Sequence, residues 1–88
     1  MIFVSVYSCP PENRRAVQAR FKETEGGKPP AGIKVLGRWH AAASGKGFGA
    51  YECDDPLALA KWAHEWSDLM SFEICPAVTD ADMAKFFV

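Results

Sequence analysis

The stretch GRWHAAASGKGFGAYE, residues 37–52, decides how the two halves of this 88-residue chain are joined. Its Gly45, Gly47 and Ala50 match the G-x-G-x-x-G/A pattern of a dinucleotide-binding turn. Such a turn has to be followed by a helix, whose first amides hold the pyrophosphate. The residues after Gly47 instead have the composition of a strand and no helical periodicity. We therefore predict a hairpin, with its turn at residues 43–47.

Four strands are predicted from runs of β-branched and aromatic residues. They cover residues 2–8, 33–40, 48–53 and 72–78. Because Pro76 has no amide hydrogen to donate to a neighbouring strand, we expect the last strand at the edge of the sheet or at a bulge.

Helices are predicted between the strands and at the C-terminus. The first covers residues 11–25, between a Pro-Pro and a Gly-Gly pair. The second covers residues 56–70, with Asp55 as N-cap and a proline directly after it. A Thr followed three residues later by Asp resembles a capping box at the start of a short helix, residues 79–86. The order β-α-β-β-α-β plus a terminal helix predicts the α+β class.

This order is the ferredoxin-like plan, in which a four-stranded antiparallel sheet carries both helices on one face. No linker separates domains, so residues 1–88 are expected to form a single domain. Side-chain alternation in the second predicted strand places Ile33, Val35 and Trp39 on one face of the sheet. The opposite face then carries Leu36, Arg38 and His40.

The two faces of the predicted sheet are both substantially apolar, whereas two helices can cover only one of them. Candidates for the uncovered face are Phe3 or Tyr7, Leu36, Tyr51 and Cys75. A second copy of the chain is the simplest cover, because a homodimer buries a self-complementary patch. We therefore expect a homodimer.

Composition excludes several classes of function. The net charge of −1, from 10 basic and 11 acidic residues, argues against a nucleic-acid partner. The three cysteines contain no C-x-x-C pair, and no His, Cys or carboxylate group has metal-ligand spacing. No apolar run approaches the ~20 residues of a transmembrane helix, and the N-terminus lacks the basic region of a signal peptide. We expect a cytoplasmic protein without metal, cofactor, nucleic acid or membrane.

The candidate pocket residues are Trp39, His40, Glu52 and Trp66. His40 is either a general base at the end of a strand or a hydrogen-bonded edge residue. Glu52 shares its face with the apolar residues of its strand, so it is either ion-paired near the second helix or an acid in a pocket. Trp39 and Trp66 are either an aromatic pocket wall or part of the core. Because Trp39 and His40 are consecutive residues of a strand, we expect their side chains to lie on opposite faces of the sheet.

The order of elements resembles the dimeric α+β barrel superfamily, in which two ferredoxin-like sheets pack face to face. Further motifs resemble a family of short bacterial proteins described only as a domain of unknown function. They are Trp39, Phe48-x-x-x-Glu52-x-Asp54-Asp55-Pro56, Trp66-Ser67-Asp68-Leu69-x-x-Phe72-Glu73 and Pro76-x-Val78. This resemblance covers nearly the whole chain. It implies the fold and a homodimer, and it implies no activity.

The superfamily includes cofactor-free monooxygenases of polycyclic aromatics, muconolactone-type isomerases, haem-degrading enzymes and stress-induced proteins. The Asn–Trp–Tyr set of the monooxygenases is matched only in part, since the sole Asn, Asn13, falls on the first helix. A helical His is used by the haem-degrading members, and His64 falls on the outer face of its helix.

Three hypotheses of function follow. The first is a small-molecule-binding or stress-related domain with a modest apolar pocket. The second is a cofactor-independent monooxygenase or isomerase acting on a small aromatic or lactone-like substrate. The third is a structural protein-interaction module.

Overall fold

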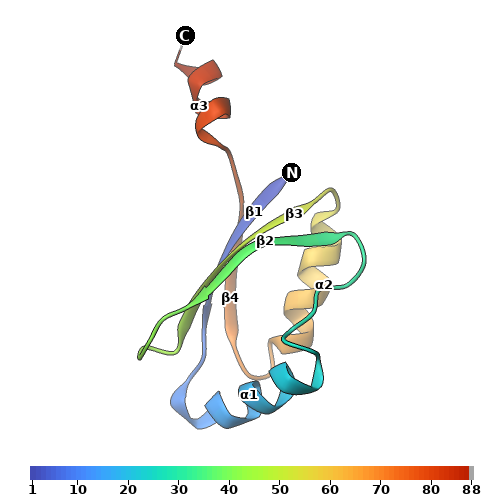
Figure 1. Ribbon diagram of the computed structural model, residues 1–88, viewed down its shortest axis with the longest axis vertical. Coiled ribbons are helices and arrows are strands. Elements are labelled where there is room, and N and C mark those ends of the chain that lie inside the picture. The colour runs from blue at the N-terminus through green and yellow to red at the C-terminus, as the bar shows by residue number, and fades with distance from the viewer. Residues whose placement is uncertain (88) are drawn as a thin grey trace.

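The computed structural model describes residues 1–87 and confirms the predicted α+β order. The elements are β1 (Ile2–Ser8), the 3-10 helix η1 (Pro11–Asn13), α1 (Arg14–Glu23), β2 (Ile33–His40), β3 (Lys46–Cys53), α2 (Pro56–Trp66), β4 (Ser71–Ala77) and α3 (Asp80–Phe86). The strands form one antiparallel sheet in the order β2-β3-β1-β4. Both α1 and α2 lie on one face of the sheet, and α3 lies beyond its end (Figure 1).

The hairpin predicted from the glycine-rich stretch joins β2 to β3, with residues 41–45 as its turn. Gly45 adopts the left-handed conformation, with φ of 72°, and its carbonyl accepts a hydrogen bond from the Cys9 amide at 2.8 Å. The predicted turn, residues 43–47, was placed two residues too far along the chain, because Lys46 and Gly47 already belong to β3 and Gly47 pairs with His40 in the β-ladder. The bond to Cys9 fixes the hairpin against the end of β1.

The register of β2 is shifted by an irregularity between Val35 and Gly37. Ile33 and Val35 face the helices, and beyond the irregularity Arg38 and His40 do so as well. The predicted grouping of Trp39 with Ile33 and Val35 was therefore wrong. An extra residue in a strand reverses the alternation of every residue after it, and no simple pattern in the sequence marks this one.

The uncovered face also differs in part from the expectation. Phe3 and Tyr51 are buried in the core, and Tyr7 lies on the same, helix-covered face. Leu36 and Cys75 are exposed, as expected. We call the uncovered surface the open face. Its exposed or half-buried apolar residues, besides Leu36 at the irregularity, are Ile2, Val4, Val6, Trp39, Phe48, Ala50, Cys75 and Ala77.

The core lies between the sheet and α2. It consists of Phe3, Ile33, Tyr51, Cys53 and Leu59. Pro76 lies on β4, at an edge of the sheet, which confirms the position predicted from its missing amide hydrogen.

The starts of α2 and α3 are as predicted, whereas the first predicted helix begins with the 3-10 helix Pro11–Asn13 and becomes α-helical only at Arg14; both long helices also end earlier than expected. The Asp55 carboxylate accepts the Leu57 amide at 3.0 Å, and α3 begins with a capping box formed by Thr79 and Asp82. α1 ends at Glu23, before three successive residues with positive φ, and α2 ends at Trp66 rather than at residue 70. Among residues 1–87, no helix is long and apolar enough to cross a membrane.

Candidate ligand-binding cavity

A cavity of about 470 Å³ lies between the helix-covered face of the sheet and the two helices. Its apolar lining comes from α1, α2 and β4 and from the segment between the last two. These side chains are Val17, Phe21, Leu59, Trp62, Ala63, Trp66, Met70, Phe72 and Ile74. Polar side chains enter mainly from β1, β2 and β3, so one wall of the cavity offers hydrogen bonds.

Two glycines of the opening stretch make room for two tyrosine rings on this wall. A Cβ atom at Gly47 would overlap the Tyr7 ring, and a Cβ atom at Gly49 would overlap the Tyr51 hydroxyl. Both glycines are buried and have ordinary strand conformations. The missing side chains therefore let both tyrosines lie close against the sheet beside the cavity.

At one end of the cavity, the Tyr7 hydroxyl shares a hydrogen bond with His40 Nδ1. The His40 ring meets the Phe21 ring edge-on, with 6.0 Å between centroids, and the Tyr7 ring lies 6.3 Å from that of Phe72. Burial raises the pKa of Tyr7, which the positive charge of Arg38 partly opposes. The phenol is therefore neutral at physiological pH and can donate a hydrogen bond.

A second hydroxyl pair lies deeper. Ser5 is buried, and its Oγ donates a hydrogen bond to the Tyr51 hydroxyl at 3.1 Å. The Tyr51 ring packs edge-on against Trp62, with 5.5 Å between centroids. Because the Tyr51 oxygen accepts this bond, its own phenolic proton is left for a further acceptor. The Tyr51 hydroxyl can thus donate a hydrogen bond to a polar atom of a bound molecule, and the Tyr7 hydroxyl can do so when His40 Nδ1 carries the proton and donates it to the Tyr7 oxygen.

Arg38 closes the cavity on the side of the loop between α1 and β2. Its guanidinium donates to the Gly26 carbonyl at 2.8 Å and to the Gly27 carbonyl at 3.2 Å, and it lies 5.5 Å from the centre of the Phe21 ring. Arg38 therefore fixes the loop and the end of α1 against β2. Gly27 has a φ of 66°, which favours glycine, and an added Cβ there would lie 3.1 Å from the Phe21 ring and 3.2 Å from this guanidinium.

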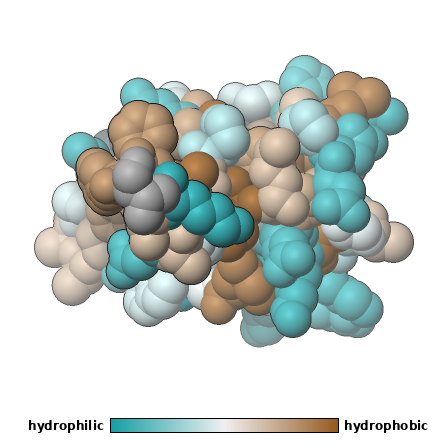
Figure 2. All heavy atoms as spheres, turned by 90° about the horizontal axis from the view of Figure 1, so that it is seen from above, coloured by the Kyte–Doolittle hydropathy of each residue, from teal (hydrophilic) through white to brown (hydrophobic). Residues whose placement is uncertain are grey.

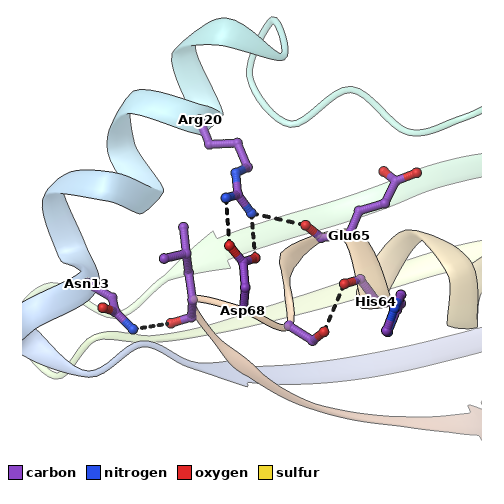
Figure 3. A network of polar contacts seen from close by, with 7 residues as sticks. Asn13, Arg20, His64, Glu65 and Asp68 are labelled. Atoms are coloured by element: carbon purple, nitrogen blue, oxygen red, sulfur yellow. Dashed lines mark hydrogen bonds and ion pairs between the residues drawn. The ribbon is translucent and has the colours of Figure 1, made fainter.

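Polar contacts at the rim hold α1 to the end of α2 (Figure 3). Arg20 donates two hydrogen bonds to the Asp68 carboxylate, at 2.7 and 2.8 Å, and a third to the Glu65 carbonyl at 3.0 Å. Asn13 donates to the Leu69 carbonyl at 3.0 Å. Hydrogen bonding to Arg20 lowers the pKa of Asp68. Because these bonds hold α1 in place at the rim, the interior beneath the helix can stay open.

The four predicted pocket residues are divided between the two faces of the sheet. His40 and Trp66 line the cavity, and Trp66 is buried, with the Arg20 guanidinium 5.6 Å from its ring centre. Trp39 lies on the open face, 60% exposed, with its ring across Gly37. Glu52 is also exposed there, directly opposite Lys34 in the β-ladder. The expectation that Trp39 and His40 point to opposite faces agrees with these positions.

Four side chains of the cavity wall were not predicted as such: Tyr7, Tyr51, Arg38 and Phe21. Tyr7 and Tyr51 were instead candidates for the uncovered face. Alternation groups Tyr7 with Phe3 and Ser5, but the opposite set of β1 is also apolar, so the sequence alone does not show that the Tyr7 set is the buried one. Within residues 1–87, no group of three His, Cys, Asp or Glu side chains could hold a metal ion. His64 is exposed on α2, away from the cavity lining.

The chain belongs to the family described as a domain of unknown function, DUF3303, whose model matches residues 1–88. This match confirms the family resemblance noted in the sequence. The chain is also similar to the crystal structure of an uncharacterized NIPSNAP-like domain protein from Burkholderia xenovorans. That match has 14% identity and a TM-score of 0.49, and it covers 90% of this chain and 85% of the other. No curated protein matches the chain.

Proposed function

We propose that this protein binds a small, mostly apolar molecule in the cavity between the sheet and the two helices. The observation that carries the proposal is the combination of about 470 Å³ of space with an aromatic and aliphatic lining and a few hydroxyl groups. Ligand sites of small molecules typically have volumes of about 300–1,000 Å³ and such a lining.

The cavity best fits a planar molecule of two or three fused or linked rings that carries a carbonyl or hydroxyl group. An engineered cavity of about 150 Å³ binds a single benzene ring, and this cavity is about three times larger. Trp62 and Phe21 offer aromatic surfaces, while Tyr7 and Tyr51 offer hydroxyl donors on the opposite wall.

Native mass spectrometry of the purified protein is the first test, because it detects a ligand that co-purifies with the chain. The second is a titration with two-ring aromatic ketones and naphthols, followed by tryptophan fluorescence. Tyr51→Phe is expected to weaken binding of a carbonyl compound about fivefold to tenfold, the value of one hydrogen bond. The matched control is Trp39→Phe on the open face, which should leave affinity unchanged. The proposal would be contradicted if no compound of the panel bound saturably and no ligand co-purified with the protein.

An enzymatic alternative rests on the Tyr7–His40 hydrogen bond at one end of the same cavity. In a cofactor-independent isomerase, His40 Nδ1–H would donate to the Tyr7 oxygen, while His40 Nε2 would take a proton from a carbon next to a carbonyl and return it to another carbon. Tyr7 would meanwhile donate a hydrogen bond to the carbonyl oxygen, where negative charge develops. Exchange of substrate protons with deuterated water, lost in His40→Ala and kept in Trp39→Phe, is the test; equal exchange in both variants argues against it.

We also propose that the protein is a homodimer joined through the open face. Trp39, Phe48, Val4 and Val6 are exposed on it, and Glu52 lies near its margin beside Lys34. An apolar sheet face of this extent is a typical interface in symmetric dimers. Light scattering after gel filtration should give twice the chain mass of 9.7 kDa. A monomer throughout the micromolar range would refute the dimer and leave the ligand site untouched.

A further inference from the structure

The last ten described residues, 78–87, form an arm that extends away from the sheet (Figure 1). Its helix α3 lies at the opposite end of the molecule from α1. Within residues 1–87, no side-chain hydrogen bond or ion pair joins α3 to a residue before Thr79. The arm is therefore not held by polar contacts to its own chain.

The arm presents large apolar side chains to solvent. Phe86 is 80% exposed and Phe87 74% exposed, with their rings edge-on to one another at 5.8 Å, and Val78 and Met83 are exposed as well. Figure 2, viewed from the end where α3 lies, shows apolar side chains gathered there. Two adjacent exposed phenylalanines at a helix end indicate a surface that is covered by something else.

The helix of the arm is too short to persist by itself. α3 has seven residues, whereas isolated helices shorter than ~12–15 residues are marginal in water. Its capping box and the Lys85–Asp82 pair at 4.0 Å contribute local stability, but they bury no apolar surface. Because α3 is short and ends in exposed phenylalanine side chains, it needs to pack against another surface to be stable.

The overall dimensions show how much surface is in excess. The radius of gyration is 14.2 Å, whereas a compact domain of this length has about 12 Å. The accessible surface is 6289 Å², whereas a compact monomer of 9.7 kDa exposes roughly 5,100 Å². The excess of about 1,200 Å² is larger than the ~800 Å² that each partner buries in a stable complex.

We propose that the arm packs on a second copy of this chain and is exchanged reciprocally across a two-fold axis. This inference rests on the homodimer proposed above. It commits to a second copy because the same chain carries both apolar surfaces, the arm and the open face. In a two-fold dimer each arm reaches beyond its own sheet onto its partner, so both arms contribute to one continuous interface.

The first test is the dimer dissociation constant from sedimentation equilibrium of the full chain. Phe86→Ser/Phe87→Ser is expected to raise it about a hundredfold or more, because four phenylalanine side chains leave the interface of the symmetric dimer. The matched control is Leu57→Ser, which changes an apolar side chain on α2 that is also exposed, at 57%, and should leave the constant unchanged. Circular dichroism checks that both variants keep the wild-type fold.

Hydrogen exchange of the unaltered protein provides a second, independent measurement. The amides of residues 80–86 should be protected at concentrations where the dimer dominates and should lose protection on dilution, while the β1 amides stay protected. A dimer whose affinity is unaffected by the double substitution overturns the role of the arm alone. Arm amides protected equally in the monomer would also overturn it, because the arm then folds back on its own chain. A wild-type monomer at all concentrations overturns the dimer and the arm together.

Discussion

Gly49 provides the sharpest test of how this cavity is built. In Gly49→Ala, the new Cβ atom overlaps the Tyr51 hydroxyl, so the ring has to move. Moving it breaks the bond from Ser5, which leaves a buried hydroxyl without its partner at a cost of about 1–3 kcal/mol. The edge-on contact with Trp62 is weakened as well, by about 0.5–1.5 kcal/mol. Alanine recovers roughly 0.5–1 kcal/mol of strand propensity relative to glycine.

The net expectation is a loss of about 1–3 kcal/mol in the free energy of unfolding. For a domain of this size that corresponds to a fall in Tm of roughly 5–20 °C. Urea and thermal unfolding, followed by circular dichroism at one fixed protein concentration, measure both quantities.

Gly37→Ala is the matched control, because its Cβ atom also overlaps an aromatic ring, that of Trp39. The Trp39 ring lies on the open face and is 60% exposed, so it can swing away at little cost. We expect a change within about 0.5 kcal/mol for this variant in dilute solution. If Gly49→Ala and Gly37→Ala change the free energy of unfolding by the same amount, the buried glycines do not serve as space for the tyrosine rings.

Three further outcomes are expected. Asp68→Asn should lower Tm at neutral pH, because the ion pair with Arg20 lowers the pKa of Asp68 and stabilises the fold. The difference in Tm from wild type should shrink as the pH falls through and below 3.8, since protonation of Asp68 removes the pair. A difference in Tm that persists unchanged at pH 2 contradicts this. Because the pKa of Tyr7 is raised, the ultraviolet titration of its phenol should occur above pH 10.0 and disappear in Tyr7→Phe. The contribution of Tyr7 to the free energy of unfolding should be complete below pH 10.0 and be lost as the pH rises above it. Asp55→Ala should reduce the free energy of unfolding by about 1 kcal/mol through loss of the cap to Leu57, whereas Asp55→Asn should retain most of it.

Local features were predictable because their causes lie within a few residues. The Asp55 cap, the capping box at Thr79 and the edge position of Pro76 each follow from one side chain and its nearest backbone. The hairpin followed from the absence of a helix after Gly47. None of these features requires knowledge of which strands are neighbours.

The cavity was less predictable because it depends on register and on a strand irregularity. Tyr7 and Tyr51 come together only once β1 pairs with β3, and a sequence with two apolar faces does not indicate which face the helices cover. The irregularity after Val35 then reverses the alternation, which brings His40 into the cavity and leaves Trp39 outside it. The hydrogen bonds from Arg20 to Asp68 and Glu65 had one indication in the sequence: an arginine next to Phe21, on the inward face of the first predicted helix.

Gly45 and Gly47, which with Ala50 match the pattern of a phosphate-binding turn, belong to a series of glycines that continues to Gly49. Their spacing of two is the period of a strand, so Gly47 and Gly49 fall on one face of β3, while Gly45 supplies the positive φ of the turn. A dinucleotide turn needs its glycines where a helix begins, with amides free for phosphate. Here β3 runs between β1 and β2, so its backbone is committed to their ladders, and the missing side chains admit two tyrosine rings instead. In β3, Gly47 and Gly49 are therefore better explained as room for the Tyr7 and Tyr51 rings than as a site for phosphate.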